Sequence, residues 1–303
     1  MSPREPKDFF KKDPGSPAKV AIFLSGSGTN AEKILDLWKS GCDAFLPVCL
    51  VTDRPLDSRA GELSEKYGLD LVSLDIKEFY QSKGLSSTSL ATEEGRQARE
   101  DWTAELFEKI KHLEIDFGIF AGFIPLTNIT DHFPCLNVHP GDLTELDDKG
   151  ERVLTGLHTL PIQKAFLKGD EALRSCVIVA CAYEEEGDGM DEGLIVGISE
   201  EVAIELKGKS REEWISEFES RGDRPAGGWK DSFQEFLKEN LECLKENGDW
   251  VVFPKVVEDF AKGKFAYSGS QLYFSSNGNW LPIEVIEYGK AGKEVYFKGL
   301  GTE

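Results

Sequence analysis

Asn137 and His139 stand one residue apart at the end of a short apolar run, CLNVHP (135–140), directly before a proline. Side chains at positions i and i+2 of a strand project from the same face, so this run would present an amide and an imidazole together. An asparagine amide can donate a hydrogen bond to a developing oxyanion, and an imidazole can donate to it or move a proton. The pair could therefore serve a tetrahedral intermediate, although a lone histidine at a strand end is more often structural.

A glycine-containing stretch, SGSGTNAEK (25–33), follows another apolar run. Glycines at such a turn let backbone N–H groups approach an anion, and the next helix adds a partial positive charge. No lysine follows the second glycine, so this is not a loop for nucleoside triphosphates. Read as G-x-G-x-x-A, with Gly26, Gly28 and Ala31, it also fits a dinucleotide fingerprint whose ribose-binding acid would be Asp53. A plain strand-to-helix turn without a ligand is the third interpretation.

A third candidate is Asp191, which lies in GDGMDEG (187–193) between a glycine-rich loop and an apolar run. One acid among 55 carries no weight by number, because most acids are solvated. Of the remaining histidines, His112 ends an expected helix and His132 lies in a polar linker. His158, in TGLHT, is the one that we expect near a site.

The composition limits the classes of partner. The chain has 303 residues, 40% of them hydrophobic, and 55 acidic against 35 basic residues give a formal charge of −20. Such a surface repels phosphate backbones and anionic membranes, which argues against nucleic-acid and membrane partners. Six scattered cysteines form no CxxC pair, so a metal site or redox motif lacks support. No segment resembles a signal peptide or a membrane span, and we expect a cytoplasmic protein.

Apolar runs and helical patterns alternate along the chain from residue 18 onward. Continuous apolar strands separated by helices predict a doubly wound α/β fold, with a mostly parallel sheet covered on both faces. The tail, 264–298, alternates like antiparallel strands, with SSNGNW as a hairpin turn. Other expected strands cover 19–26, 44–53, 69–76, 115–122, 175–183 and 194–206, and expected helices cover 29–41, 58–68, 93–112, 157–169 and 251–264.

Several motifs in this order resemble the folate-dependent formyltransferases, and most closely their glycinamide ribonucleotide branch. The resemblance extends over about 18–206 and 249–286, and it includes VVFPKVVEDFAKGKF as the last helix of the domain. The combination of Asn-x-His-Pro with a later Asp-x-Gly is more specific than the glycine loop. The motifs are AIFLSGSGTN, DFGIFAGFIPLTN, CLNVHP, GLHTLPIQKAFLKGD and MDEGLIV.

The resemblance implies roles for individual residues. The catalytic residues would be Asn137, His139 and Asp191, with His158 in support. Folate would lie against the backbone of 121–126 and the loop before Asp191. The implied phosphate-binding residues are Gly26, Ser27, Gly28, Thr29 and Asn30, and the implied folate-binding residues are Phe123, Ile124, Leu126, Gly189 and Met190.

The implied activity is formyl transfer from 10-formyltetrahydrofolate, as co-substrate, to the primary amine of a small phosphorylated substrate. Glycinamide ribonucleotide, in purine biosynthesis, is the first candidate acceptor. An amino sugar nucleotide as acceptor, or hydrolysis of formyltetrahydrofolate, would need the same three residues. A non-catalytic binding protein and an NAD-dependent dehydrogenase rank lower, and a homo-oligomer is allowed.

The chain departs from the family pattern at four places. After His-Pro stands a longer stretch with five acids, which changes how a phosphate would be held. Pro125 occupies the position of an arginine that the family associates with the glutamate tail of folate. We further expect a flexible arm over 1–17, a charged helical insertion over 207–248 and a C-terminal extension over 287–303. The five acids are Asp142, Glu145, Asp147, Asp148 and Glu151.

Overall fold

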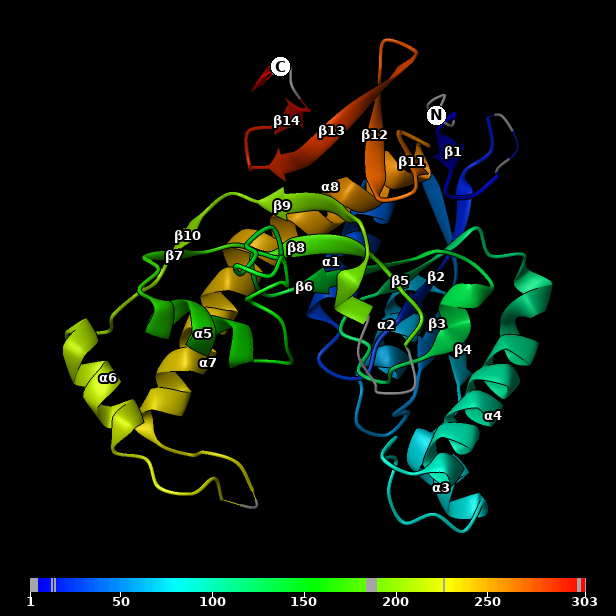
Figure 1. Cartoon of the computed structure of the whole chain (residues 1–303). Helices are drawn as coiled ribbons and strands as arrows, with labels where there is room; N and C mark the ends of the chain where they lie inside the picture. Colours follow the sequence, from blue (N-terminus) through cyan, green and yellow to red (C-terminus); the bar gives the residue numbers. More distant parts are fainter. Residues whose placement is uncertain are drawn as a thin grey trace.

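The computed structural model describes residues 5–11, 13, 15–183, 190–225, 227–298 and 301–302. A single large sheet runs through the molecule, and helices lie outside it (Figure 1). In the described part, its strand order is β1-β11-β12-β13-β9-β8-β6-β5-β2-β3-β4. No helix among these residues is both long enough and apolar enough to cross a membrane.

The sheet was expected to be mostly parallel, and its part from β6 through β5, β2 and β3 to β4 is parallel. Strand β2 lies between β3 and β5, and β6 extends the same direction beyond β5. Strand β8 is antiparallel to β6, and β9 is antiparallel to β8. This arrangement confirms the predicted doubly wound α/β fold. The strands are β2 (Ala18–Phe23), β3 (Phe45–Thr52), β4 (Asp70–Ser73), β5 (Phe117–Phe120), β6 (Cys135–His139), β8 (Cys176–Ala180) and β9 (Ile195–Ser199).

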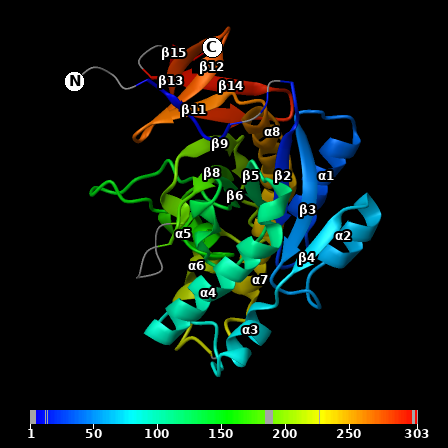
Figure 2. The same ribbon diagram turned by 90° about the vertical axis from the view of Figure 1, so that its right-hand side faces the viewer.

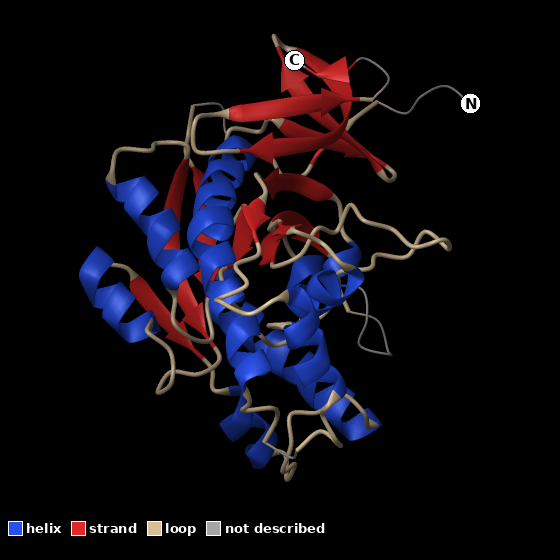
Figure 3. Ribbon diagram, turned by 90° about the vertical axis from the view of Figure 1, so that its left-hand side faces the viewer, coloured by secondary structure: helices blue, strands red, loops and turns tan. Residues whose placement is uncertain are grey.

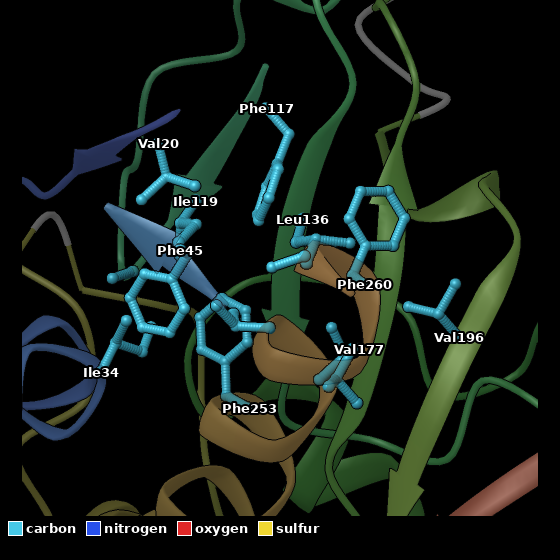
Figure 4. Close-up of a cluster of buried hydrophobic side chains, with 14 of the residues drawn as sticks. Val20, Ile34, Phe45, Phe117, Ile119, Leu136, Val177, Val196, Phe253 and Phe260 are labelled. Carbon is cyan, nitrogen blue, oxygen red and sulfur yellow. The ribbon is translucent and has the colours of Figure 1, made fainter. Parts of the chain in front are cut away.

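The two faces of the sheet follow from the alternation of side chains along each strand. On one face, Val20 and Ile22 pack with α1 (Thr29–Lys39), α2 (Ala60–Tyr67) and α8 (Trp250–Ala261). Figure 4 shows this cluster, in which α8 contributes two phenylalanines.

On the other face, Ala21 and Phe23 pack with α3 (Ile76–Ser82) and α4 (Glu93–Ile110). Helix α3 was not expected, because its short apolar pattern merges with that of the preceding strand. Figure 3 shows helices packed around the central strands, while the strands at the C-terminal end lie beyond the helices.

The charged segment after β9 forms the expected helices, α6 (Arg211–Glu219) and α7 (Ser232–Leu244). They build a second core with α5 (Leu160–Lys168), in which Phe166, Trp214 and Phe236 meet. These helices lie together on one side of the molecule, away from α3 and α4 (Figure 1). A π-helical turn, η4 (Lys245–Asp249), joins α7 directly to α8.

The C-terminal strands pair antiparallel with one another, as predicted, and join the large sheet through the parallel pair of β13 with β9. They gather at one end of the molecule (Figure 2). The hairpin turn has Asn277 and Gly278 at positive φ, 49° and 81°. The expected boundary at residue 287 falls inside β13, so the extension is continuous with the sheet. The strands are β11 (Phe265–Ser268), β12 (Gln271–Ser276), β13 (Asn279–Tyr288), β14 (Lys293–Phe297) and β15 (Gly301–Thr302). The remaining short elements are β7 (Ala172–Leu173), β10 (Val202–Ala203), η1 (Lys111–Leu113) and η2 (Asn128–Asp131).

The N-terminal segment differs from the flexible arm that was expected over 1–17. Strand β1 (Lys7–Asp8) pairs antiparallel with β11. Phe9 lies 5.1 Å from Phe260 between ring centroids, and Phe10 lies 5.3 Å from Phe117. The apolar pair FF, hidden in a charged stretch, thus fastens the described part of this segment to the core.

We predict that replacing Phe9 and Phe10 together by alanine lowers the free energy of unfolding. Each ring is partly buried, so a loss of about 1–3 kcal/mol per side chain is expected. Urea denaturation measures the change, with Leu56→Ala as the control because Leu56 is 90% exposed. An unchanged unfolding midpoint in the double variant would restore the flexible-arm interpretation.

Candidate active site

Strand β6 carries the two residues with which the sequence analysis began. It lies between β5 and β8, where Asn137 is opposite Ile178 and His139 is opposite Cys176. Asn137 is partly buried and His139 is 3% exposed. Because the two positions differ by two, both side chains leave the same face of the sheet at the carboxyl end of β6.

Both ring nitrogens of His139 have partners. Nε2 lies 2.7 Å from the backbone oxygen of Leu154, and Nδ1 lies 3.4 Å from Oδ2 of Asp191. A carbonyl oxygen can only accept, so Nε2 carries the proton of the neutral ring. Nδ1 is then the unprotonated nitrogen of the neutral ring, and it faces the Asp191 carboxylate. The structure thus brings His139 and Asp191 together, 52 residues apart in the sequence.

Gly141 explains how the chain returns so closely over the imidazole. A Cβ atom at this position would lie 2.6 Å from the Leu154 oxygen and 3.1 Å from Nε2 of His139. A side chain there would force the Leu154 carbonyl away from the ring. The glycine after His-Pro is therefore part of the support of His139.

The glycine loop leads into α1 as expected. Gly28 has φ 63°, and a Cβ atom there would lie 2.8 Å from Leu63 and 3.0 Å from Leu24. The left-handed φ favours glycine at this position, and α1 begins at the next residue, where the first N–H groups of a helix lack intrahelical acceptors. Such groups suit an anion. The Asn30 amide nitrogen Nδ2 donates to Asp249 at 3.0 Å, while its Oδ1 is buried without a hydrogen-bond partner.

Asp249 is a candidate residue that sequence reasoning missed. It ends the π-helical turn, is 4% exposed, and accepts hydrogen bonds from Asn30 and from Ser175 Oγ at 2.6 Å. Burial raises the pKa of Asp249, while these hydrogen bonds and the charge of His139 oppose the shift. In the sequence it stands in a long charged run, which hides one buried acid among many exposed ones.

Asp53 does not take the role that the dinucleotide interpretation gave it. Its carboxylate is fully buried and accepts from Ser25 Oγ at 2.5 Å, and Ser25 Oγ accepts from the Ile124 backbone N–H at 2.9 Å. Burial raises the pKa of Asp53 above its ordinary value. The acid therefore ties the glycine loop to the 121–126 segment instead of reaching for a ribose.

The expected folate-binding segment lines a cavity of about 340 Å³. Ile124 and Leu126 face it, whereas Phe123 is 7% exposed and packs on Phe23 in the core. Gly189 lies outside the described residues, and the side chain of Met190 is likewise not described. The cavity is lined by Asp53, Arg54, Ile76, Thr88, Leu90, Arg99, Ile124, Pro125 and Leu126.

Two arginines, Arg54 and Arg99, border this cavity, although Pro125 occupies the position of the arginine in the family pattern. Arg99 is buried, and its guanidinium donates to the backbone oxygens of Leu126 at 2.7 Å and Thr88 at 2.9 Å. The Arg54 side chain is 35% exposed and lies beside Asp53. Their positive charge could not be assigned to this cavity from the sequence, because neither belongs to a motif.

His158 stands four residues after Leu154, in the loop before α5. It is exposed, with φ 56°, and within the described ranges no hydrogen bond or ion pair joins it to Asn137 or His139. Its supporting role stays a prediction.

We predict that Asp249→Asn changes how stability depends on pH. Because burial raises the pKa of Asp249 from its ordinary value of 3.8, its contribution to stability is complete below that value. The contribution is lost as the pH rises through the pKa of the folded state. The loss amounts to about 1.4 kcal/mol for each pH unit that separates the pKa values of the folded and unfolded chain.

Thermal unfolding at pH 4.5 and pH 8 tests this, with exposed Asp43→Asn as the matched control. The Asp249→Asn variant should gain stability relative to the wild type as the pH rises. A relative loss at pH 8 would show that the charged carboxylate stabilises the fold.

Known proteins resemble this chain in sequence and in fold. No family model matches the sequence. The phosphoribosylglycinamide formyltransferase of Arabidopsis thaliana, described as chloroplastic, is 27% identical over 154 residues, 50% of this chain and 45% of that protein. The match therefore spans less than half of that relative's length.

Solved structures agree over a larger share of the chain. Glycinamide ribonucleotide transformylase 1 from Symbiobacterium toebii covers 86% of this chain and 96% of its own, with 21% identity and a TM-score of 0.56. Formyltetrahydrofolate deformylase from Burkholderia mallei covers 88% of this chain and 72% of its own, with 14% identity and a TM-score of 0.52. The resemblance to the folate-dependent formyltransferases is thus confirmed, and the chain has their fold.

Proposed function

We propose that this protein transfers a formyl group from 10-formyltetrahydrofolate to the primary amine of a small substrate. The observation that carries the proposal is the placement of Asn137 and His139 on one strand face with Asp191 against the imidazole. The similarity to a phosphoribosylglycinamide formyltransferase supports the same reaction.

The three side chains suit the chemistry of acyl transfer to an amine. The amine nitrogen attacks the formyl carbon, and the carbonyl oxygen becomes an oxyanion. The Asn137 amide donates to that oxygen, an interaction worth about 3 kcal/mol in comparable oxyanion holes. As the tetrahedral intermediate collapses, the bond to the folate nitrogen breaks and that nitrogen receives a proton.

The proton path follows from the tautomer of His139. Nε2 is held by Leu154, so the exchangeable position is Nδ1, beside Asp191. The Asp191 side chain is 27% exposed and can take the proton that the attacking amine loses. No nucleophilic side chain needs to form a covalent intermediate in this scheme.

The cavity beside 121–126 offers a place for folate. Its apolar residues, Ile124 and Leu126, suit a flat ring system, and Arg54 and Arg99 place positive charge at the wall. That charge favours a carboxylate-bearing tail, as folate carries, although Pro125 replaces the family's arginine.

Glycinamide ribonucleotide is our first candidate for the amine, which would place the protein in purine biosynthesis. Its phosphate would bind the N–H groups at the start of α1, because the Asn30 amide nitrogen Nδ2 already donates to Asp249. The carboxyl group of Asp249 would repel a phosphate placed beside Asn30. Neutral hydroxyl groups of the acceptor would lie there instead. An amino sugar nucleotide is the alternative acceptor.

Hydrolysis of formyltetrahydrofolate is the second candidate function. The likeness to a formyltetrahydrofolate deformylase supports it, and the partial exposure of Asp191 leaves room for a water molecule to be activated. In that case water replaces the amine and formate leaves.

The deciding experiment follows loss of the formyl group from 10-formyltetrahydrofolate by absorbance, with and without glycinamide ribonucleotide. Loss that depends on the amine supports the transferase, and equal loss without it supports the hydrolase. No loss in either case, with amino sugar nucleotides also tested, would overturn both functions.

We predict that Asn137→Ala and His139→Ala each lower kcat by about 10²-fold or more while the fold is retained. The matched controls are Asn279→Ala, at an exposed position of β13, and His132→Ala, whose ring stacks on Phe107. Near-normal turnover in either site variant would exclude the residue from the mechanism.

A further inference from the structure

The acidic stretch after His-Pro is a small hairpin. Leu146 and Arg152 form an antiparallel bridge, and the Val153 N–H donates to the Glu145 oxygen at 3.1 Å. Oδ1 of Asp147 accepts from the backbone N–H groups of Lys149 at 2.8 Å and Glu151 at 2.9 Å. Asp147, one of the five acids of this stretch, therefore closes the turn of the hairpin.

Both ends of the hairpin are fastened to the body of the protein. Leu143 is fully buried, and its N–H donates to Cys176 Sγ at 3.2 Å. On the returning side, Lys164 Nζ of α5 donates to the backbone oxygens of Val153 at 3.1 Å and Thr155 at 3.0 Å. The carbonyl between these two is that of Leu154, which holds His139.

The side chain of Arg152 reaches the other catalytic segment. Its Nη1 donates to the backbone oxygen of Asp191, and its Nη2 donates to the backbone oxygen of Gly193 at 2.8 Å. Asp191 lies in η3 (Met190–Glu192), a single 3-10 turn of three residues, so the two bonds from Arg152 fasten the backbone at and just after this turn. Since both bonds go to carbonyls, the Asp191 carboxylate stays available to His139.

We propose that Arg152 is a positioning residue that fixes Asp191 against His139, so that the hairpin sets both partners of the proton path. Its backbone, through Leu154, orients the imidazole, and its side chain, through Arg152, places the carboxylate. The proposal rests on the formyl-transfer function proposed above. A displacement of about 1 Å in such a pair can cost about 10²-fold in rate.

The chain offers a matched control in Arg211. Its guanidinium also donates to two backbone oxygens, those of Phe166 and Asp170, both at 2.5 Å, but it lies in the second core. Arg211→Ala removes the same kind of bonds as Arg152→Ala without touching the residues around His139.

The experiment compares Arg152→Ala, Arg152→Lys and Arg211→Ala with the wild type in the formyl-transfer assay. We expect kcat to fall about 10- to 100-fold in Arg152→Ala, with KM for the amine little changed and an altered pH–rate profile. The kcat of Arg152→Lys should lie between those of the wild type and Arg152→Ala, because one ammonium group cannot span both carbonyl oxygens. Guanidinium added to the assay should partly restore the kcat of Arg152→Ala. Arg211→Ala should keep the wild-type pH–rate profile.

A second readout does not depend on turnover. The ring resonances of His139, one of four histidines, can be followed by NMR at fixed pH. In Arg152→Ala they should move as they do in Asp191→Asn, because both changes remove the carboxylate from Nδ1.

Wild-type kcat in Arg152→Ala, an equal kcat loss in Arg211→Ala, or unmoved His139 resonances would overturn the positioning role. An inactive wild type whose His139 resonances still respond would overturn the proposed function and keep the positioning role.

Discussion

The hydrogen bond between His139 Nε2 and the Leu154 carbonyl is the interaction on which the candidate site depends. It fixes the tautomer, and thereby decides that Nδ1 faces the Asp191 carboxylate. The bond needs a close return of the chain, which Gly141 permits and the anchored hairpin enforces. The geometry of the candidate site is thus set as much by backbone as by side chains.

The three acids near the candidate site differ in exposure. Asp191 is partly exposed, whereas Asp53 and Asp249 are buried, and burial raises the pKa of each of these two. Both buried acids accept from serine hydroxyls, so they act as hydrogen-bond acceptors that join segments. The net charge of −20 therefore says little about the site.

The sequence predicts the parts of this molecule that have local patterns. Strand periodicity placed Asn137 and His139 on one face, and alternating apolar strands and helices indicated the parallel sheet. The support of His139 escaped prediction because a backbone carbonyl, such as that of Leu154, has no signature in the sequence. Arg152 and Asp249 escaped because charged residues in polar runs are usually solvated, and their burial depends on tertiary packing. Phe9 and Phe10 were missed for the converse reason, being two apolar residues within a charged segment.

The π-helical turn between α7 and α8 has a geometric consequence for the whole molecule. In an α-helix each residue rotates the chain by about 100°, so the one-residue difference per turn at 245–249 sets the angular phase between the two helices. With that phase, α7 directs Phe236 into the second core while Asp249 turns inward against Asn30. Without the extra residue of the π-helical turn, Asp249 would be rotated by about 100° about the helix axis relative to Phe236. The π-helical turn therefore lets α7 pack in the second core while Asp249, at the start of α8, contacts Asn30 beside the glycine loop.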